Sequence, residues 1–292
     1  MKQRLRVSES FGMSLSQFDL SFVAVGPQRT GTTWLYEMLR GHPQICMPEA
    51  VKETMFFDKR FGRGIDWYAS YFDHGEEGQI NGEVAPTYFD TSGVPQRINE
   101  IAPDCEIIIS LRHPAERAFS LYLHHLKKGR VPPSLWGAIE QKPRILTAGN
   151  YSEHIPRWKS IFGKEQIHLL FLSDIHDRPR EVLHRVCDWI GVRWKNDWFS
   201  GVNQNVNTKS IPRSPFLAGL VSLLVDKLHK YSLHRVVEIG KKVGAKEIIY
   251  SKEKSKLPKM SDKEREKLID FYEEDIKYVK REAKRNLKSW VK

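Results

Sequence analysis

Residues 26–35 read GPQRTGTTWL, which comes close to a common loop pattern for binding phosphate. That pattern, G-x-x-x-x-G-K-[ST], requires a lysine directly after its second glycine. Gly26 and Gly31 have the required spacing, but Thr32 stands at the lysine position and the nearest cation is Arg29, inside the loop. The segment is therefore a damaged ATP site, a chance string, or a loop built for another phosphate donor.

The composition of the loop favours the third interpretation. A glycine loop that leads into a helix offers several backbone N–H groups and a helix N-terminus to an anion. Thr30, Thr32 and Thr33 add hydroxyl donors, while Arg29 adds a planar charged group that suits phosphate or sulfate oxygens. We expect a phosphate or sulfate group to bind here.

A second set of polar residues lies in LRHPAERAFSLYLHH, residues 111–125. Arg112 follows an apolar run and Ser120 lies two helical turns further on, so this pair can hold a separate phosphate near a helix start. His124 and His125 at the end of the segment are alternative catalytic bases. Neighbouring helix positions point in different directions, so only one of the two histidines can face a site.

The third candidate is Glu53, in the segment KETMFFD at residues 52–58. A carboxylate held beside aromatic residues can have its pKa tuned for general-base catalysis. The alternative is an ordinary surface glutamate at the start of an element. Lys52 and Lys127 either guide an anionic acceptor or are simply solvated.

These residues depend on strands that alternate with helices. Short apolar runs predict strands at 21–26, 105–111 and 167–172, each followed by a helix, at 32–40, 114–128 and 179–190 respectively. Residues 82–89 predict one more short strand. This alternation indicates an α/β domain with a mainly parallel central sheet flanked by helices on both faces.

In such sheets, ligands bind at the carboxyl ends of the strands, which is where Gly26 and Arg112 are expected. A kinase would also need an acidic residue at a strand end to hold Mg²⁺. The two later strands end in SLRHP and FLSD, so Asp174 is the only weak candidate that they offer. We therefore expect the phosphate-containing group donor to require no metal ion.

The whole chain has the composition of one globular domain, with 292 residues, of which 40% are hydrophobic and 28% charged. No apolar run approaches the roughly 20 residues that span a bilayer. The first 20 residues read as a basic extension without the apolar core of a signal peptide, and the three cysteines are far apart. We therefore expect a cytoplasmic protein.

The C-terminal part, residues 205–292, is predicted to be helical and packed on the core. Residues 216–244 have helical apolar spacing with basic residues between, which favours packing, with peripheral contact to a membrane as the alternative. A capping box from Ser261 to Glu264 predicts one final helix that continues through residue 287. Much of the net charge of +11 lies in this part.

Taken together, GPQRTGTTWL, LRHPAERAFS and KETMFFD resemble the PAPS-dependent sulfotransferase family, and most closely the branch of heparan sulfate N- and 3-O-sulfotransferases with their bacterial relatives. The resemblance covers residues 22–291 and includes GIDWYASYF, GEVAPTYFD and GNYSEHIPRW. It implies a P-loop-like three-layer domain that uses PAPS, releases PAP and requires no metal.

The resemblance also implies roles for individual residues. Glu53 matches the family's proposed base, and Arg29 stands where the family usually has a lysine that touches the sulfonate. Val84 stands where heparan-type enzymes often carry a lysine, which argues against a heparan-like acceptor. The implied donor-binding residues are Gln28, Arg29, Thr30, Gly31, Thr32, Thr33 and Trp34 for the 5′-phosphosulfate, Arg112 and Ser120 for the 3′-phosphate, Tyr151 in a lining segment, and Lys209 or Arg213 as a late basic contact.

The expected function is transfer of a sulfuryl group from PAPS to a hydroxyl or amine of a small-molecule or carbohydrate acceptor, by in-line displacement. One alternative is a small-molecule kinase that uses ATP and magnesium. Another is a basic module that binds anionic glycan, lipid or nucleic acid without catalysis; as an enzyme, the protein is expected to bind no nucleic acid. The loops at 59–80, 129–150 and 191–250 are expected to decide which acceptor binds.

Overall fold

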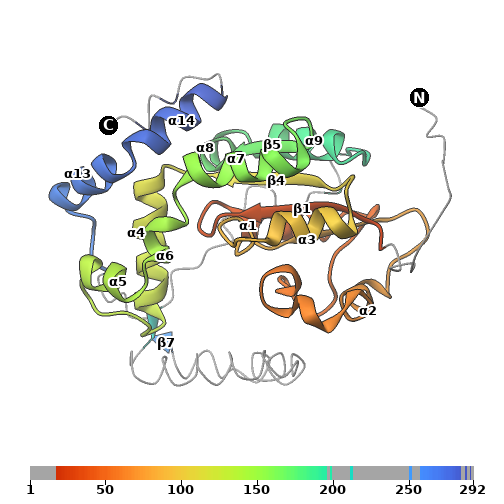
Figure 1. Cartoon of the computed structure of the whole chain (residues 1–292), viewed down its shortest axis with the longest axis horizontal. Helices are drawn as coiled ribbons and strands as arrows, with labels where there is room; N and C mark the ends of the chain where they lie inside the picture. The colour runs from red at the N-terminus through yellow and green to blue at the C-terminus, as the bar shows by residue number, and fades with distance from the viewer. Residues whose placement is uncertain are drawn as a thin grey trace.

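The computed structural model describes residues 18–195, 198, 211–212, 250–251, 257–283, 287 and 290. The helix predicted over 216–244 lies outside these residues, as do Lys209 and Arg213. The described residues include the central sheet and the helices that cover it, which are shown in Figure 1.

The centre of the fold is a five-stranded sheet with the order β2-β3-β1-β4-β5. All four neighbouring pairs in this sheet run parallel, as predicted. β1 lies in the middle because its residues are apolar on both sides of the strand, which suits burial between two helical layers. The strands are β1 (Leu20–Gly26), β2 (Ile45–Cys46), β3 (Ile80–Val84), β4 (Glu106–Leu111) and β5 (Ile167–Phe171).

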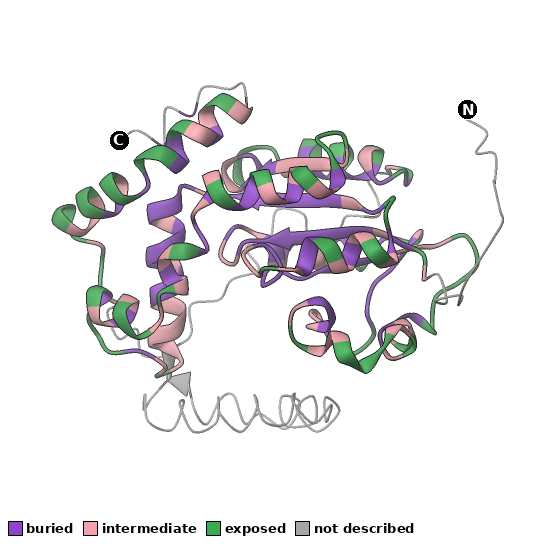
Figure 2. Cartoon of the chain, in the orientation of Figure 1, coloured by how far each residue is buried: buried purple, intermediate pink, exposed green. Residues whose placement is uncertain are grey.

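Successive residues of β1 pack on opposite faces of the sheet. Phe22 and Ala24 belong to a buried cluster with α1 (Thr32–Leu39) and α9 (Pro179–Trp189). Val23 and Val25 belong to the other cluster, with α3 (Val94–Ile101) and α7 (Tyr151–Phe162). This arrangement gives three layers, with the sheet in the middle, and the central strands β1 and β4 are almost entirely buried (Figure 2).

The remaining elements surround this core. α4 stands at one end of the sheet, and α2 lies near its other end (Figure 1). Their bounds, with those of the other elements, are α2 (Ile65–Ala69), α4 (Pro114–Lys127), α5 (Leu135–Gln141), α6 (Arg144–Thr147), α8 (Leu172–Asp177), a π-helix (Phe56–Arg60), two 3-10 turns (Phe61–Arg63 and Ser70–Phe72), and the antiparallel pair β6 (Ile211–Pro212) and β7 (Tyr250–Ser251).

One predicted strand has the wrong bounds, and one strand was not predicted. The strand predicted over residues 82–89 is β3, which ends at Val84, because Pro86 has no N–H to continue a ladder and the Tyr88 N–H bonds to the Ala85 carbonyl in a turn. The sequence also did not indicate β2, which has only two residues and therefore no visible periodicity.

The prediction of a single C-terminal helix is also wrong, since the structure has two helices in this region. α13 (Asp262–Phe271) starts at the predicted capping box, but the backbone leaves helical geometry at Tyr272 before α14 (Glu273–Ala283) begins. Tyr272 is fully buried and its hydroxyl donates to the Leu146 carbonyl at 2.7 Å. The break lets α13 pack on α4 and α14 on α7.

No helix among the described residues has the length and apolarity needed to cross a membrane. The outward faces of α13 and α14 are largely exposed, while their inward faces are buried against the domain (Figure 2). These two helices pack on the core, whereas residues 213–249 of the part predicted to be helical lie outside the described residues.

Candidate active site

The glycine loop lies where predicted, between the carboxyl end of β1 and the start of α1. Gly26 has a φ of 94°, and a Cβ at this position would lie 2.6 Å from the Pro86 Cα, so only glycine fits the turn. Arg29 also has a positive φ, 75°, which is unusual for a residue with a side chain. Such backbone geometry persists only where neighbouring contacts hold it in place.

Thr30 supplies two of those contacts. Its hydroxyl donates to the Pro27 carbonyl at 2.6 Å and accepts from the Ser110 hydroxyl of β4 at 2.6 Å. Both side chains are buried, so this hydroxyl shapes the loop and does not point to a ligand. Trp34, another predicted binding residue, is buried in the cluster between α1 and the sheet.

Three other loop residues, Gln28, Gly31 and Thr33, have the exposure that a ligand contact requires. Gly31 is the N-cap residue that directly precedes α1, and its φ is 98°. Thr32 is buried in the first turn of α1. These positions place backbone N–H groups of a helix N-terminus at the carboxyl edge of the sheet.

Arg29 reaches from this loop to α4. Its Nε donates a hydrogen bond of 3.1 Å to the Ser120 Oγ. Burial and the nearby charge of Arg112 lower the pKa of the Arg29 guanidinium. Two arginines and a hydroxyl predicted to bind different phosphates therefore lie at one place, and the concentrated positive charge favours a multiply charged anion.

Both the backbone carbonyl and the side chain of Arg112 have protein partners. The Tyr151 hydroxyl donates to the Arg112 carbonyl at 2.8 Å, so the fully buried Tyr151 supports Arg112. The Arg112 side chain lies 3.5 Å from Glu116, which also pairs with Arg265 of α13 at 2.8 Å. Arg265 is not evident from the sequence, because nothing in its local pattern indicates that α13 packs beside α4.

Glu53 lies in the segment that precedes the π-helix. Burial raises its pKa above the usual value, and the opposite charge of Lys52, 3.5 Å away, counteracts this rise. The side chain nevertheless keeps 21% of its exposure, so solvent or an acceptor can reach it. Lys52 lies near enough to Arg29 for the two charges to interact, and this connects the predicted base to the glycine loop.

The two histidines of α4 lie near the same region but are poor bases. Burial, followed by the charge of Lys128, lowers the pKa of His124 to about 3, and Arg29 contributes to the shift. Burial and the charge of Lys142 lower the pKa of His125 to about 4. Since general bases work best with a pKa near the working pH, this comparison favours Glu53.

Glu83 on β3 is a buried acid that sequence analysis did not single out. Its side chain is fully buried, and burial raises its pKa to about 7. It accepts two hydrogen bonds from Thr54, the residue after Glu53, and others from Tyr68 and Tyr88. The segment GEVAPTYFD contained this acid, but periodicity alone does not show which buried strand residue has polar partners.

Asp174 does not act as a free acidic group at the sheet edge. It is buried on α8 and lies 3.8 Å from Arg178 and 3.7 Å from Arg185. The described residues contain no group of three or more histidine, cysteine, aspartate or glutamate side chains placed to hold a metal ion.

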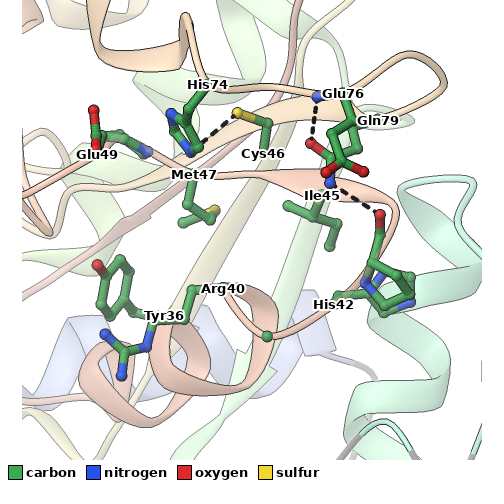
Figure 3. Close-up of a pocket in the computed structure, with 13 residues that line it drawn as sticks. Tyr36, Arg40, His42, Ile45, Cys46, Met47, Glu49, His74, Glu76 and Gln79 are labelled. Atoms are coloured by element: carbon green, nitrogen blue, oxygen red, sulfur yellow. Dashed lines mark hydrogen bonds between the residues drawn. The ribbon is translucent and has the colours of Figure 1, made fainter.

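A pocket of about 510 Å³ lies beside the edge strand β2, and Figure 3 shows the residues that line it. Within it, the Cys46 Sγ lies 3.6 Å from the His74 Nε2. None of its lining residues is a predicted donor-binding or catalytic residue, although His74, Glu76 and Gln79 belong to the loop predicted to select the acceptor.

The fold and the loop together define an α/β protein with an anion-binding site at the carboxyl edge of a parallel sheet, the usual position for ligands that contain phosphate. The chain belongs to the sulfotransferase domain family, whose model matches residues 20–214. The resemblance read from the sequence motifs is thereby confirmed.

Individual relatives agree with this assignment. The chain is 27% identical over 217 residues to a bifunctional heparan sulfate N-deacetylase/N-sulfotransferase of Drosophila melanogaster, covering 63% of this chain and 21% of that protein. It is 32% identical over 179 residues to human heparan sulfate glucosamine 3-O-sulfotransferase 6, covering 58% and 51%. The chain thus spans about a fifth and about half of these two relatives.

A solved structure supports the fold. The crystal structure of a sulfotransferase from Alicyclobacillus acidocaldarius matches with a TM-score of 0.65 and 22% identity, covering 94% of this chain and 99% of that chain. The similarity extends over nearly the whole length of both chains and confirms the P-loop-like α/β architecture.

Proposed function

We propose that this protein is a PAPS-dependent sulfotransferase that transfers a sulfuryl group to a hydroxyl or amine of a small-molecule or carbohydrate acceptor. The observation that carries the proposal is the meeting of Arg29, Arg112 and Ser120 at the carboxyl edge of the sheet. A ligand with phosphates at two positions, as PAPS has, suits this concentration of donors and positive charge.

The chain's own residues supply the binding and the electrostatics. The backbone N–H groups of the loop and the start of α1, with Arg29, would hold the 5′-phosphosulfate, and Arg112 with Ser120 would hold the 3′-phosphate. When bound, PAPS supplies the sulfuryl group, and its bridging oxygen stays with the released PAP. Arg29 would stabilise the negative charge that develops on that oxygen.

Glu53 would act as the general base. Its partial burial and raised pKa bring it closer to the working pH than an exposed glutamate would be, and its neighbour Lys52 favours the ionised form that accepts a proton. The acceptor hydroxyl or amine would lose its proton to Glu53 as it attacks the sulfur. Positioning and electrostatic stabilisation would supply the remaining acceleration, as in phosphoryl transfer.

A kinase that uses ATP and magnesium is less well supported. Glu83 is an acid on the strand next to β1, but both of its oxygens accept hydrogen bonds from protein groups. Its partners Tyr68 and Tyr88 belong to the cluster on the α3 side of the sheet, whereas α1 packs on the opposite face. Glu83 therefore faces the α3 side of the sheet, where its oxygens are already occupied by protein donors.

The acceptor need not resemble heparan sulfate. The relatives named above carry heparan sulfate in their names, but Val84, where heparan-type enzymes often have lysine, is fully buried against the α1 side of the sheet. In this chain the position therefore offers no cation to an anionic sugar. We therefore favour an acceptor chosen by the loops around residues 59–80 and 129–150.

The test compares donors and then products. Calorimetric titration should show tight binding of PAP, with weaker binding of ATP in the presence of magnesium. Incubation with PAPS and a panel of glycans and metabolites should yield a product whose mass increases by one SO₃ group. Tight ATP binding without PAP binding would contradict the proposal, and salt-dependent polyanion binding without a sulfated product would favour the non-catalytic alternative.

A further inference from the structure

The carboxylate of Glu83 accepts two hydrogen bonds from Thr54, the residue that follows Glu53. Its Oε1 accepts from the Thr54 backbone N–H at 2.7 Å and from the Thr54 hydroxyl at 2.8 Å. Its Oε2 accepts from the Tyr68 hydroxyl at 3.0 Å and the Tyr88 hydroxyl at 3.2 Å. Four donors around one fully buried carboxylate form a complete set of partners, which a buried charge requires.

Thr54 is fixed at every polar group. Its side-chain oxygen accepts from the Phe56 N–H at 3.1 Å, and its carbonyl accepts from the Arg60 Nη1 at 3.0 Å. Its backbone N–H and hydroxyl are both donated to Glu83, and the residue is fully buried. Because Thr54 cannot move without breaking several buried hydrogen bonds, the Cα of its neighbour Glu53 is held as well.

The backbone around this point needs such support. Met55, the next residue, has a φ of 57°, in the left-handed region that residues with a side chain rarely adopt. The π-helix Phe56–Arg60 starts directly afterwards, and the Phe57 N–H bonds to the Tyr88 hydroxyl at 3.3 Å. The segment therefore combines strained geometry with a dense set of hydrogen bonds centred on β3.

We propose that Glu83 is a positioning residue for the reaction, because it clamps Thr54 to the carboxyl end of β3 and so sets where the neighbouring Glu53 presents its carboxylate. The proposal rests on the role of Glu53 given above. Glu83 does not itself exchange a proton with substrate, since it is fully buried and both of its oxygens are occupied. Through Thr54 it connects the sheet to the catalytic segment.

The test compares Glu83→Leu with Glu83→Gln. Leucine fills the space but accepts no hydrogen bond, so we expect hydrogen–deuterium exchange at the amides of residues 54–57 to rise about tenfold or more. We expect kcat to fall by about 10- to 100-fold, as for a misplaced catalytic group, with PAP affinity unchanged within about twofold. Glutamine keeps an acceptor oxygen for Thr54 and should restore most of both properties.

The chain contains a matched control. Asp275 of α14 accepts from the Ser152 N–H at 2.8 Å and the Ser152 hydroxyl at 2.7 Å, the same kind of grip in a different place. Asp275→Leu should lower the thermal midpoint without increasing exchange at residues 54–57. If it increased that exchange as much as Glu83→Leu did, the effect would be general destabilisation and the proposal would be overturned.

Two further results would overturn the proposed positioning role of Glu83. The first is unchanged exchange at residues 54–57 in Glu83→Leu. The second is a Glu83→Gln variant as impaired as Glu83→Leu, which would show that the charge of Glu83 is required and not its hydrogen bonds. The exchange measurement does not depend on activity. If the wild-type protein formed no sulfated product, the proposed function would fail, while the exchange data would still support or overturn the clamp.

Discussion

The Nε of Arg29 lies 3.1 Å from the Oγ of Ser120, so the glycine loop after β1 and the helix after β4 are joined by a direct hydrogen bond. The first of these residues was expected at the sulfonate end of the donor, and the second at its 3′-phosphate. Their contact makes the two halves of the proposed donor site a single unit. A substitution at Ser120 should therefore also affect how Arg29 binds the donor.

Ser120→Ala tests this connection. The variant removes the hydroxyl that accepts from Arg29 and that would also contact the 3′-phosphate. Since a hydrogen bond to a charged group contributes about 1.5–3 kcal/mol, we expect PAP affinity to fall by about 10- to 100-fold in calorimetry. Ser160→Ala on α7, whose hydroxyl bonds only to the Arg157 carbonyl, serves as the control and should bind PAP normally. Equal affinities for all three proteins would contradict the assignment.

Arg29→Lys and Arg29→Ala separate charge from geometry. An arginine can bond to Ser120 through Nε while its two Nη groups face a ligand, whereas a lysine has one ammonium group. We expect Arg29→Ala to lose about 10²- to 10³-fold in kcat, as when one donor that stabilises developing charge is removed, and Arg29→Lys to lose less. Single-turnover rates with saturating PAPS provide the measurement. An alanine variant with full kcat would remove Arg29 from the mechanism.

Arg265 tests whether α13 contributes to the donor site. Arg265 pairs with Glu116, which also pairs with Arg112. Without Arg265, the negative charge of Glu116 would act on Arg112 only and would weaken its attraction for a phosphate. The side chain of Arg265 is 40% exposed, so solvent weakens the effect and we expect Arg265→Ala to reduce PAP affinity only about two- to fivefold. Raising the salt concentration should shrink the difference. Arg281→Ala on α14 is the control, and an equal loss in both variants would indicate a general effect of net charge.

Lys52→Met tests the electrostatic tuning of Glu53. The base must be ionised, so kcat/KM should fall as the pH decreases through the pKa of Glu53, which burial raises above its usual value near 4.5. Lys52 lowers that pKa, and its removal should therefore move the acidic limb of the pH profile to higher pH. A limb that stays in place or moves to lower pH would show that Glu53 is not the titrating group.

The elements that could be predicted are those with a strong local signal. The glycine loop, the apolar strands β1 and β4, and the capping box at Ser261 each show in a few consecutive residues, and the structure has them where expected. The meeting of the glycine loop with Arg112 also followed, because parallel strands place their carboxyl ends at one edge.

What the sequence did not reveal depends on contacts between distant segments. Glu83 looks like any strand residue until Thr54, Tyr68 and Tyr88 are folded around it. Similarly, the break at Tyr272 follows from packing on α4 and α7, since charged residues on either side continue a helical pattern without interruption. Tertiary contacts override local propensity at such places.

The most direct test of the account is Glu53→Gln, which keeps the shape of the side chain but removes its ability to accept a proton. With PAPS and an acceptor found in the product screen, single-turnover transfer should slow by about 10²- to 10⁴-fold, the usual loss for a general base, while calorimetry shows PAP binding as tight as in the wild type. Near-normal transfer by Glu53→Gln with intact PAP binding would contradict the central claim that Glu53 is the catalytic base.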